Sequence, residues 1–157
     1  MSATPAPEGC VFCTASQPSA DDGLVVHRGR RAFVVLNLYP YNNGHLMVVP
    51  HRHIASLTAA TADELSELMA LTALAERVLR EAYEPQGLNV GLNLGRAAGA
   101  GIDQHLHVHV VPRWAGDTNF MTTVGDVRVL PETVEAAADR LRPFFARATA
   151  PEPTPEP

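Results

Sequence analysis

The sequence predicts a single α+β domain built on an antiparallel β-sheet. Four short apolar runs, at 24–28, 31–37, 44–49 and 87–95, are separated by turn-forming residues. A fifth segment, 104–111, alternates between polar and apolar side chains, as a half-buried strand does. Helical periodicity occurs only between the third and fourth runs and after the fifth. This excludes a repeated βαβ arrangement and favours a meander sheet.

The first two runs are separated by Gly29 and Arg30, which predicts a β-hairpin. The turn-forming segment LYPYNNG follows the hairpin, and the third strand then ends at Pro50. The run at 87–95 gives the fourth strand, and the histidine-containing segment gives the fifth.

One strong helix is expected after the third strand. Thr61 and Glu64 match a capping box, in which each side chain accepts a backbone N–H at the helix start. Apolar or small residues then recur every three or four positions, so the helix should end at about Ala82. This stripe comprises Leu65, Leu68, Thr72, Ala75 and Leu79. A second helix is expected from Pro131, with Pro143 as a candidate interruption.

The fifth strand contains three of the seven histidines of the chain. In QHLHVHVVPRW, His105, His107 and His109 occupy every second position, so their side chains share one face. Their Cα atoms should be about 7 Å apart, given a rise of about 3.3 Å per residue. Pro112 is expected to close the strand. Three interpretations stay open: a polar strand face, a zinc site made by the histidines, or one nucleophilic histidine oriented by its neighbours.

Composition narrows the class of protein. The chain has 157 residues, 46% of them hydrophobic, and a formal net charge of −5. These values fit one globular domain without a basic surface for nucleic acid. No apolar run could span a bilayer, and residues 1–8 lack the features of a signal peptide, so a cytoplasmic protein without a membrane partner is expected. The tails at 1–8 and 148–157 are rich in Pro, Ala, Thr and Glu and are expected to be disordered, which leaves a domain at 9–147.

Cys10 and Cys13 are the only cysteines of the chain. Two cysteines in a reducing compartment do not make a disulfide framework. Their CxxC spacing suits a pair of metal ligands or a redox pair, or it is incidental.

The segments GHLMVVP, NLG and QHLHVHVVPR, in this order, resemble the histidine triad family of nucleotide hydrolases and transferases. The family signature, His-φ-His-φ-His-φ-φ with φ apolar, is filled by residues 105–111. The resemblance extends over roughly 9–145. It implies a HIT-like fold, a five-stranded antiparallel sheet with two helices, in which the sheet continues across a homodimer, with a tetramer as the alternative assembly.

The segment RWAGDTNF, which follows the triad, is similar to one branch of this family. That branch contains dinucleoside polyphosphate hydrolases and diadenosine tetraphosphate phosphorylases. The alternatives are a purine-nucleoside phosphoramidase of the same family, a zinc metallohydrolase with three histidine ligands, and a nucleotide sensor without chemistry.

The resemblance implies a reaction at an α-phosphate. His107 would attack the phosphorus and form a nucleotidyl intermediate, which passes to water in a hydrolase or to inorganic phosphate in a phosphorylase. Imidazole suits this task because its pKa lies near 7. His45 and a backbone carbonyl would orient the nucleophile, and His109 would donate to the phosphate or to the bridging oxygen.

Four further residues are candidates for substrate binding. Asn37 and Asn93 match family positions that contact ribose and phosphate. Gly99 and Gly101 belong to a glycine-rich loop whose backbone N–H groups can approach an anion closely. Members of the family usually have a Gly-Gln-Ser/Thr step there. The missing amide side chain leaves the choice between water and phosphate open.

Two residues after the triad are candidates for selecting dinucleotides. Arg113 could hold a polyphosphate with its planar fork. Trp114, the only tryptophan, offers a face on which a second base could stack, or it packs a loop instead. Magnesium is expected to accompany the phosphates of the substrate.

Some histidine triad proteins, and the related galactose-phosphate uridylyltransferases, close a zinc site with two histidines. By this resemblance the ligands would be Cys10, Cys13, His53 and His105, with His51 as a substitute for His53. A Cys2His2 set occupies all four tetrahedral positions, so the zinc would be structural.

Overall fold

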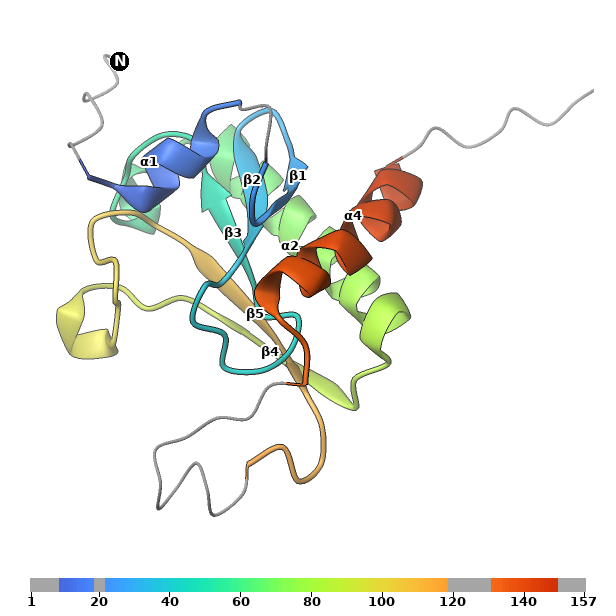
Figure 1. Cartoon of the computed structure of the whole chain (residues 1–157). Coiled ribbons are helices and arrows are strands. Elements are labelled where there is room, and N and C mark those ends of the chain that lie inside the picture. The colour runs from blue at the N-terminus through green and yellow to red at the C-terminus, as the bar shows by residue number, and fades with distance from the viewer. Residues whose placement is uncertain (1–8, 19–21, 119–130, 150–157) are drawn as a thin grey trace, which may run out of the picture.

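The computed structural model describes residues 9–18, 22–118 and 131–149. In these ranges five antiparallel strands combine with three helices and two short 3-10 turns, which confirms the predicted α+β class (Figure 1). The strands are β1 (Val25–Arg28), β2 (Ala32–Leu36), β3 (Leu46–Pro50), β4 (Gly87–Gly91) and β5 (Val108–Arg113). The helices are α1 (Val11–Ser16), α2 (Ala62–Tyr83) and α4 (Val134–Thr149), and the turns are η1 (Leu57–Ala59) and η2 (Arg96–Ala98). None of these helices is long and apolar enough to cross a membrane.

The strand order is β1-β2-β3-β5-β4, and all neighbouring strands are antiparallel. The predicted hairpin is present, but the prediction of a simple meander is wrong, because β5 lies between β3 and β4. The order follows burial. Strand β3 is buried throughout and β5 nearly so, whereas the last three residues of β4 are exposed. The more apolar strand takes the central position because side chains there are covered on both faces.

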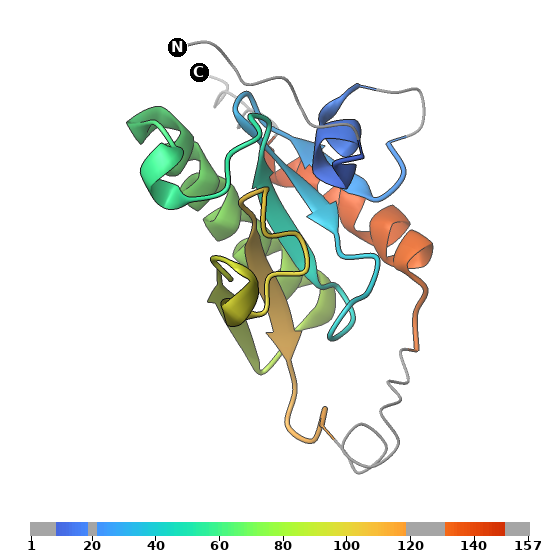
Figure 2. The same ribbon diagram turned by 90° about the vertical axis from the view of Figure 1, so that its left-hand side faces the viewer.

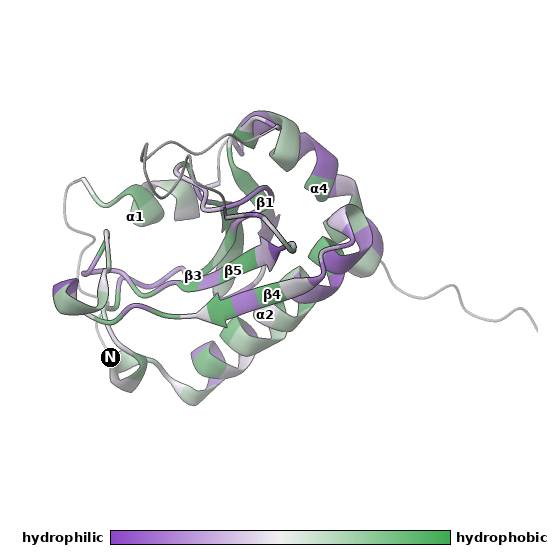
Figure 3. Cartoon of the chain, turned by 90° about the horizontal axis from the view of Figure 1, so that it is seen from below, coloured by the Kyte–Doolittle hydropathy of each residue, from purple (hydrophilic) through white to green (hydrophobic). Residues whose placement is uncertain are grey.

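The two faces of the sheet are covered differently. Helices α2 and α4 pack side by side against one face (Figure 2). Helix α1 and helix α2 lie on opposite sides of β3 and β5 (Figure 3). The larger core lies under α2 and α4 and includes Val34, Val48, Val110, Leu79, Leu141 and Phe145. The smaller core lies under α1 and comprises Phe12, Val25, Phe33, Val35, Met47 and Val49.

Helix α2 begins as predicted. The Thr61 side chain accepts from the Glu64 backbone N–H at 3.3 Å, and the Glu64 carboxylate accepts from the Thr61 backbone N–H at 2.8 Å. The helix ends at Tyr83, one residue beyond the expected end, because Glu84 adopts a left-handed conformation with φ 47°. Its buried stripe contains Leu68, Leu71, Thr72, Ala75, Val78 and Leu79.

Helix α4 differs from the prediction in three ways. It begins at Val134 rather than at Pro131, and it continues through Pro143 without interruption. Pro143 is exposed, so the carbonyl that it leaves without an N–H partner can be hydrated, while Leu141 and Phe145 hold the flanking turns on the core. The helix also reaches Thr149, two residues past the expected domain boundary at 147. The rest of the tails at 1–8 and 150–157 lies outside the described residues.

Strand β5 is shorter at its start than predicted. It begins at Val108, so His105 and His107 precede it. The backbone N–H of Leu106 donates instead to Ile54 O, at 2.6 Å, in the segment after β3. The prediction that Pro112 closes the strand is also wrong. The pairing with β3 ends at Val110, so Pro112 needs a partner on one side only and lies opposite Leu88 of β4.

Candidate active site and metal centre

The side chains of His105, His107 and His109 face away from α2, as the alternation predicts. Leu106 and Val108 between them are buried in the larger core. His105 and His107 are only 1% and 5% exposed. Imidazoles buried to this extent need hydrogen-bond partners, and these partners define which ring nitrogen carries the proton.

His107 is oriented by the backbone two residues earlier. Its Nδ1 lies 2.8 Å from the carbonyl oxygen of His105. A carbonyl only accepts, so Nδ1 carries the proton and Nε2 keeps its lone pair. The ring of His107 also lies 4.8 Å from that of His109 and 5.1 Å from that of Phe12, between ring centroids. His107 is therefore held as a tautomer whose Nε2 can act as a nucleophile.

A second chain of hydrogen bonds fixes His109. The backbone N–H of Tyr41 donates to Nδ1 of His45 at 3.0 Å. Nε2 of His45 must then carry the proton, and it donates to Nδ1 of His109 at 2.9 Å. Nε2 of His109 consequently carries a proton and is free to donate. Burial, and secondarily the charge of His107, lower the pKa of His109 to about 4, so His109 donates as a neutral imidazole at pH 7.

The position of His45 depends on the turn before β3. Gly44 has φ +71°, and a Cβ there would lie 2.9 Å from the Tyr83 ring, so the turn requires glycine. His45 is fully buried, and its Nε2 bonds to His109 as described above. The structure connects His45 to His109, and the expectation that His45 orients the nucleophile stays a prediction.

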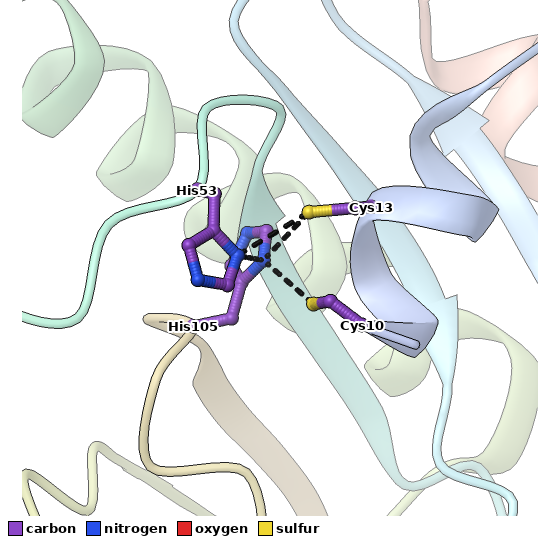
Figure 4. A group of neighbouring side chains, drawn as sticks. All are labelled: Cys10, Cys13, His53 and His105. Atoms are coloured by element: carbon purple, nitrogen blue, oxygen red, sulfur yellow. Dashed lines mark hydrogen bonds between the residues drawn. The ribbon is translucent and has the colours of Figure 1, made fainter. Parts of the chain in front are cut away.

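A second group of side chains converges beside the first histidine of the triad. Cys10 immediately precedes α1, Cys13 lies in its first turn, His53 follows β3 and His105 precedes β5 (Figure 4). Nδ1 of His105 lies 3.4 Å from Sγ of Cys10 and 3.6 Å from Sγ of Cys13. Nδ1 of His53 lies 3.3 Å from Sγ of Cys13 and 3.2 Å from Nδ1 of His105. All four ligand atoms lie within 4.8 Å of one another, and Cys10, Cys13, His53 and His105 together form the metal group.

These separations fit a tetrahedral metal. With Zn–S of about 2.3 Å and Zn–N of about 2.05 Å, tetrahedral ligands stand about 3.3 Å apart for N···N and about 3.6 Å apart for S···N. Nε2 of His105 lies 2.9 Å from the carbonyl oxygen of Pro50, which fixes its proton there and leaves the Nδ1 lone pair for a metal. Without a cation, burial and the adjacent Cys10 raise the pKa of the Cys13 thiol to about 11. The set is thus suited to a cation that would stabilise the thiolates.

His51 does not belong to this group. Its Nδ1 lies 2.8 Å from Oγ of Ser16, and its Nε2 donates to the carbonyl of Gly29 at 3.1 Å. Both ring nitrogens are engaged, so His53, not His51, is the ligand candidate after β3.

Two hollows lie on the sheet, and one of them has a triad histidine, His109, in its wall. One, of about 770 Å³, is mostly apolar and lies between α1 and β1–β2, with Phe12, Val35, Asn37 and Met47 in its wall. The other, of about 380 Å³, is more polar and lies over β4 and β5. Its wall includes Tyr41, Asn42, Asn89, Asn93, His109 and Arg113. The structure thus places Asn37 and Asn93 in different hollows. Of the histidine row, which is His105, His107 and His109, only His109 lines one of these two hollows, the one with Asn93.

The glycine-rich loop lies farther from the histidine row than expected. Gly101 lies in a third hollow of about 340 Å³, together with Cys10 and His53, and so it borders the metal group. Gly99 is exposed and ends η2 with φ 86°, and it lines none of the hollows in the described residues. The structure does not bring either glycine together with His107 or His109.

Arg113 is already paired. Its Nε and Nη2 donate to the two oxygens of Asp117 at 2.7 and 2.9 Å, and its Nη1 donates to Asn89 Oδ1 at 2.7 Å. The fork expected for a polyphosphate is therefore occupied by a carboxylate. Trp114 is half-buried, its backbone N–H donates to Asp117 at 3.1 Å, and it does not line either hollow beside the row.

Sequence reasoning missed several residues around the row. Phe12 is missed because α1 is too short to show a period, although its place inside the CxxC motif was a signal. Tyr41 is missed because it acts through its backbone N–H, which leaves no trace in the side-chain pattern. Asp117 is missed for another reason: an acidic residue four positions after an arginine is common, so its spacing from Arg113 does not mark it as part of a site. Asn42 donates to that carboxylate at 2.7 Å and is missed with it.

Comparisons with known proteins agree with this geometry. The HIT domain model matches residues 19–116. The chain is 50% identical over 136 residues to the AP-4-A phosphorylase of Mycobacterium tuberculosis, covering 87% of this chain and 70% of that protein.

Solved structures are similar as well. A hypothetical histidine triad nucleotide-binding protein from Sulfolobus tokodaii is 29% identical with a TM-score of 0.70, covering 88% of this chain and 93% of that one. A Zn-bound histidine triad family protein from Mycobacterium smegmatis is 28% identical with a TM-score of 0.70, covering 88% and 94%. With its family signature, fold and histidine geometry in agreement, the chain belongs to the HIT, or histidine triad, family.

Proposed function

We propose that the protein is a diadenosine tetraphosphate phosphorylase that works through a nucleotidyl-His107 intermediate. The observation that carries the chemistry is the bond from Nδ1 of His107 to the carbonyl of His105, which leaves Nε2 free to attack. The 50% identical relative named AP-4-A phosphorylase supports phosphate, rather than water, as the acceptor.

In the first step Nε2 of His107 attacks an α-phosphorus, a P–N bond forms, and the bond to the bridging oxygen breaks. The leaving group is ATP when the substrate is diadenosine tetraphosphate. Terminal phosphate oxygens have a pKa of about 6, so ATP leaves as an anion without taking a proton. The Nε2–H of His109 donates a hydrogen bond to the oxygens that gain charge, and its low pKa suits this role because no proton has to be transferred.

In the second step an oxygen of inorganic phosphate attacks the same phosphorus, and the P–N bond breaks. ADP is released and His107 returns to its starting tautomer, since the Nδ1 proton never leaves the carbonyl of His105. The sum is diadenosine tetraphosphate plus phosphate giving ADP plus ATP, so atoms and charge balance.

The apolar hollow of about 770 Å³ suits the nucleoside of the transferred AMP. Its wall carries aliphatic and aromatic side chains for a base, and Asn37 supplies a polar group at the end near His45. The polar hollow with Asn93 and His109 then lies on the leaving-group side. Magnesium on the phosphates stays a prediction, tested by adding and withholding Mg²⁺ in the assay.

The metal would be zinc, held by Cys10, Cys13, His53 and His105. When bound, it would supply a four-coordinate cross-link and no open site for a water. Both cysteines are free thiols, as ligands must be, which suits the reducing cytoplasm expected from the sequence. Elemental analysis of protein purified without added metal should give about one zinc per chain, and zinc retained in a Cys10→Ser/Cys13→Ser variant would contradict this assignment.

The assembly would be a homodimer formed through β4. Apolar side chains are exposed along this edge of the sheet. Val90 in β4 is 49% exposed, and Leu94, in the segment that follows β4, is 46% exposed. Unpaired edges of this kind extend a sheet by pairing with another chain. Light scattering would show a dimer, and a Val90→Lys variant should shift it toward the monomer.

Product analysis tests the reaction. The protein is incubated with diadenosine tetraphosphate, with and without inorganic phosphate. ADP plus ATP formed only with phosphate supports a phosphorylase, whereas AMP plus ATP in its absence would mean a hydrolase. Faster turnover of an adenosine phosphoramidate than of the dinucleotide would mean a phosphoramidase.

The three triad histidines do not support a metallohydrolase. Nδ1 of His107 is bonded to a carbonyl, Nδ1 of His109 to His45, and only His105 takes part in a convergent set of metal-ligand atoms among the described residues. A chelator should therefore remove no catalytic ligand, and folded metal-free protein should still form the nucleotidyl intermediate at saturating substrate, although it binds the nucleoside more weakly.

A further inference from the structure

Helix α1 contributes to two sites at once. Cys10 and Cys13 belong to the metal group, and Phe12 between them is 3% exposed and faces the histidine row. The same helix also forms one wall of the apolar hollow, through Val11, Phe12, Thr14 and Ala15. The opposite wall is formed by residues of β1, β2 and β3 in the sheet.

Helix α1 cannot hold this position by itself. It has only six residues, and the residue before it makes no side-chain capping bond. Helices of this length are unstable without tertiary anchors. Its C-terminal end is anchored by Arg28, whose Nη1 donates to the carbonyls of Ala15 and Ser16 at 3.0 and 3.2 Å. Its N-terminal end is anchored by the ligands Cys10 and Cys13, which point at His53 and His105.

The N-terminal anchor also reaches the nucleophile. The Phe12 ring lies 5.4 Å from the ring of His105 and 5.1 Å from the ring of His107. The ring of His105 belongs to the metal group, and its backbone carbonyl accepts the hydrogen bond from Nδ1 of His107. Two routes thus lead from the metal group to His107, one through the His105 backbone and one through Phe12.

We propose that the metal site controls nucleoside binding: by fixing α1 it completes the wall of the nucleoside hollow and, through Phe12, holds the ring of His107. This inference rests on the proposed function for the identity of the ligand. Phe12 is a positioning residue in it, and the metal is needed for the shape of the pocket as well as for stability.

The experiment compares AMP binding to zinc-loaded protein, to protein treated with a chelator, and to the Cys10→Ser/Cys13→Ser variant, by calorimetry. Loss of the wall should weaken AMP binding about 10- to 100-fold, the range expected when one large apolar contact is lost. Hydrogen exchange should rise in residues 10–17 and stay unchanged in β2 and β3. The control for general destabilisation is Leu141→Ala, in the core under α4, which should leave the Kd for AMP unchanged.

A second variant, Phe12→Leu, alters the wall of the hollow while it leaves all four metal-ligand candidates in place. Phe12→Leu should keep its zinc, weaken AMP binding about 3- to 10-fold, and slow formation of the nucleotidyl intermediate in a single turnover by more than it weakens AMP binding. Unchanged AMP affinity in the metal-free protein, or in Phe12→Leu, would overturn the inference. Zinc-loaded protein that does not bind AMP at all would overturn the proposed function together with it.

Discussion

The face of the sheet under α2 and α4 is filled almost entirely by aliphatic side chains, whereas the opposite face buries His45, His105 and His107. On the first face, packing alone decides the structure, and neighbouring aliphatic residues can replace one another at modest cost. On the second face single hydrogen bonds fix the tautomers: Nε2 of His105 bonds to Pro50 O, Nδ1 of His107 to His105 O, and Nε2 of His45 to His109. We therefore expect substitutions on the first face mainly to change stability, and substitutions of the buried histidines on the second face mainly to change activity.

The largest effect is expected for His107→Ala. Loss of a covalent nucleophile should lower kcat by about three to six orders of magnitude. The variant should still fold, although it loses the hydrogen bond to His105 O and the ring contacts with Phe12 and His109. Turnover close to wild type, measured by product chromatography, would contradict the assignment of the nucleophile.

A core substitution on the helix-covered face should behave in the opposite way. Leu141 is fully buried between α4 and the sheet. Leu141→Ala should lower the free energy of unfolding by about 2–5 kcal/mol. Its kcat/KM per folded molecule should stay within about twofold of wild type, since no hydrogen bond of the histidine row is touched. A large loss of kcat/KM in folded protein would show that the two faces are coupled.

The ion pair between Glu64 and Arg52 connects helix α2, on one face of the sheet, to the segment that carries the metal-ligand candidate His53. Glu64 caps α2, and it binds Nε and Nη2 of Arg52 at 2.8 and 2.7 Å, just before the metal ligand candidate His53. Its hydrogen bonds with Arg52 lower the pKa of Glu64 to about 2, from 4.5. Glu64→Gln should therefore cost about 2 kcal/mol at pH 7, after allowance for the partial exposure of Arg52.

The pH dependence follows from the direction of this shift. A carboxyl with a depressed pKa in the folded state contributes its stability above pH 4.5 and loses it as the pH falls toward 2. The difference between wild type and Glu64→Gln in urea unfolding should therefore be constant above pH 5 and shrink below it. A difference that is independent of pH would mean that the ion pair contributes nothing.

The sequence predicted much of the helix-covered face. The capping box at Thr61, the stripe of α2 and the hairpin could be predicted because each rests on local spacing. The position of β5 between β3 and β4 could not, because strand order depends on comparing burial across the whole sheet. Helix α4 passes Pro143 because tertiary packing overrides a local preference.

The candidate site was predictable where side chains carry the signal. The four metal-ligand candidates meet as the resemblance implied, although they come from three separate segments. The tautomers of His45 and His109 could not be predicted, because they depend on the backbone N–H of Tyr41. The pairing of Arg113 with Asp117 was missed because a sequence does not show whether the guanidinium donors of an arginine are already bonded to a carboxylate.

The smallest effect is expected for Trp114, in the segment after β5. Asp117 accepts from the Trp114 backbone N–H and from Arg113, so this turn is fixed by a carboxylate next to the polar hollow. We expect Trp114 to help bind the second nucleoside, by stacking worth about 1–2 kcal/mol. Its half-buried position also allows a purely packing role.

Two substitutions and two substrates separate these roles. Trp114→Ala should lower kcat/KM about 5- to 30-fold for diadenosine tetraphosphate and leave it unchanged for an adenosine phosphoramidate, which has no second nucleoside. Trp114→Phe keeps an aromatic face and should recover most of the loss. An equal fall for both substrates, together with dissociation of the dimer in light scattering, would show that Trp114 packs the loop. In that case the segment after β5 would belong with the aliphatic face, as a region that carries stability rather than substrate recognition.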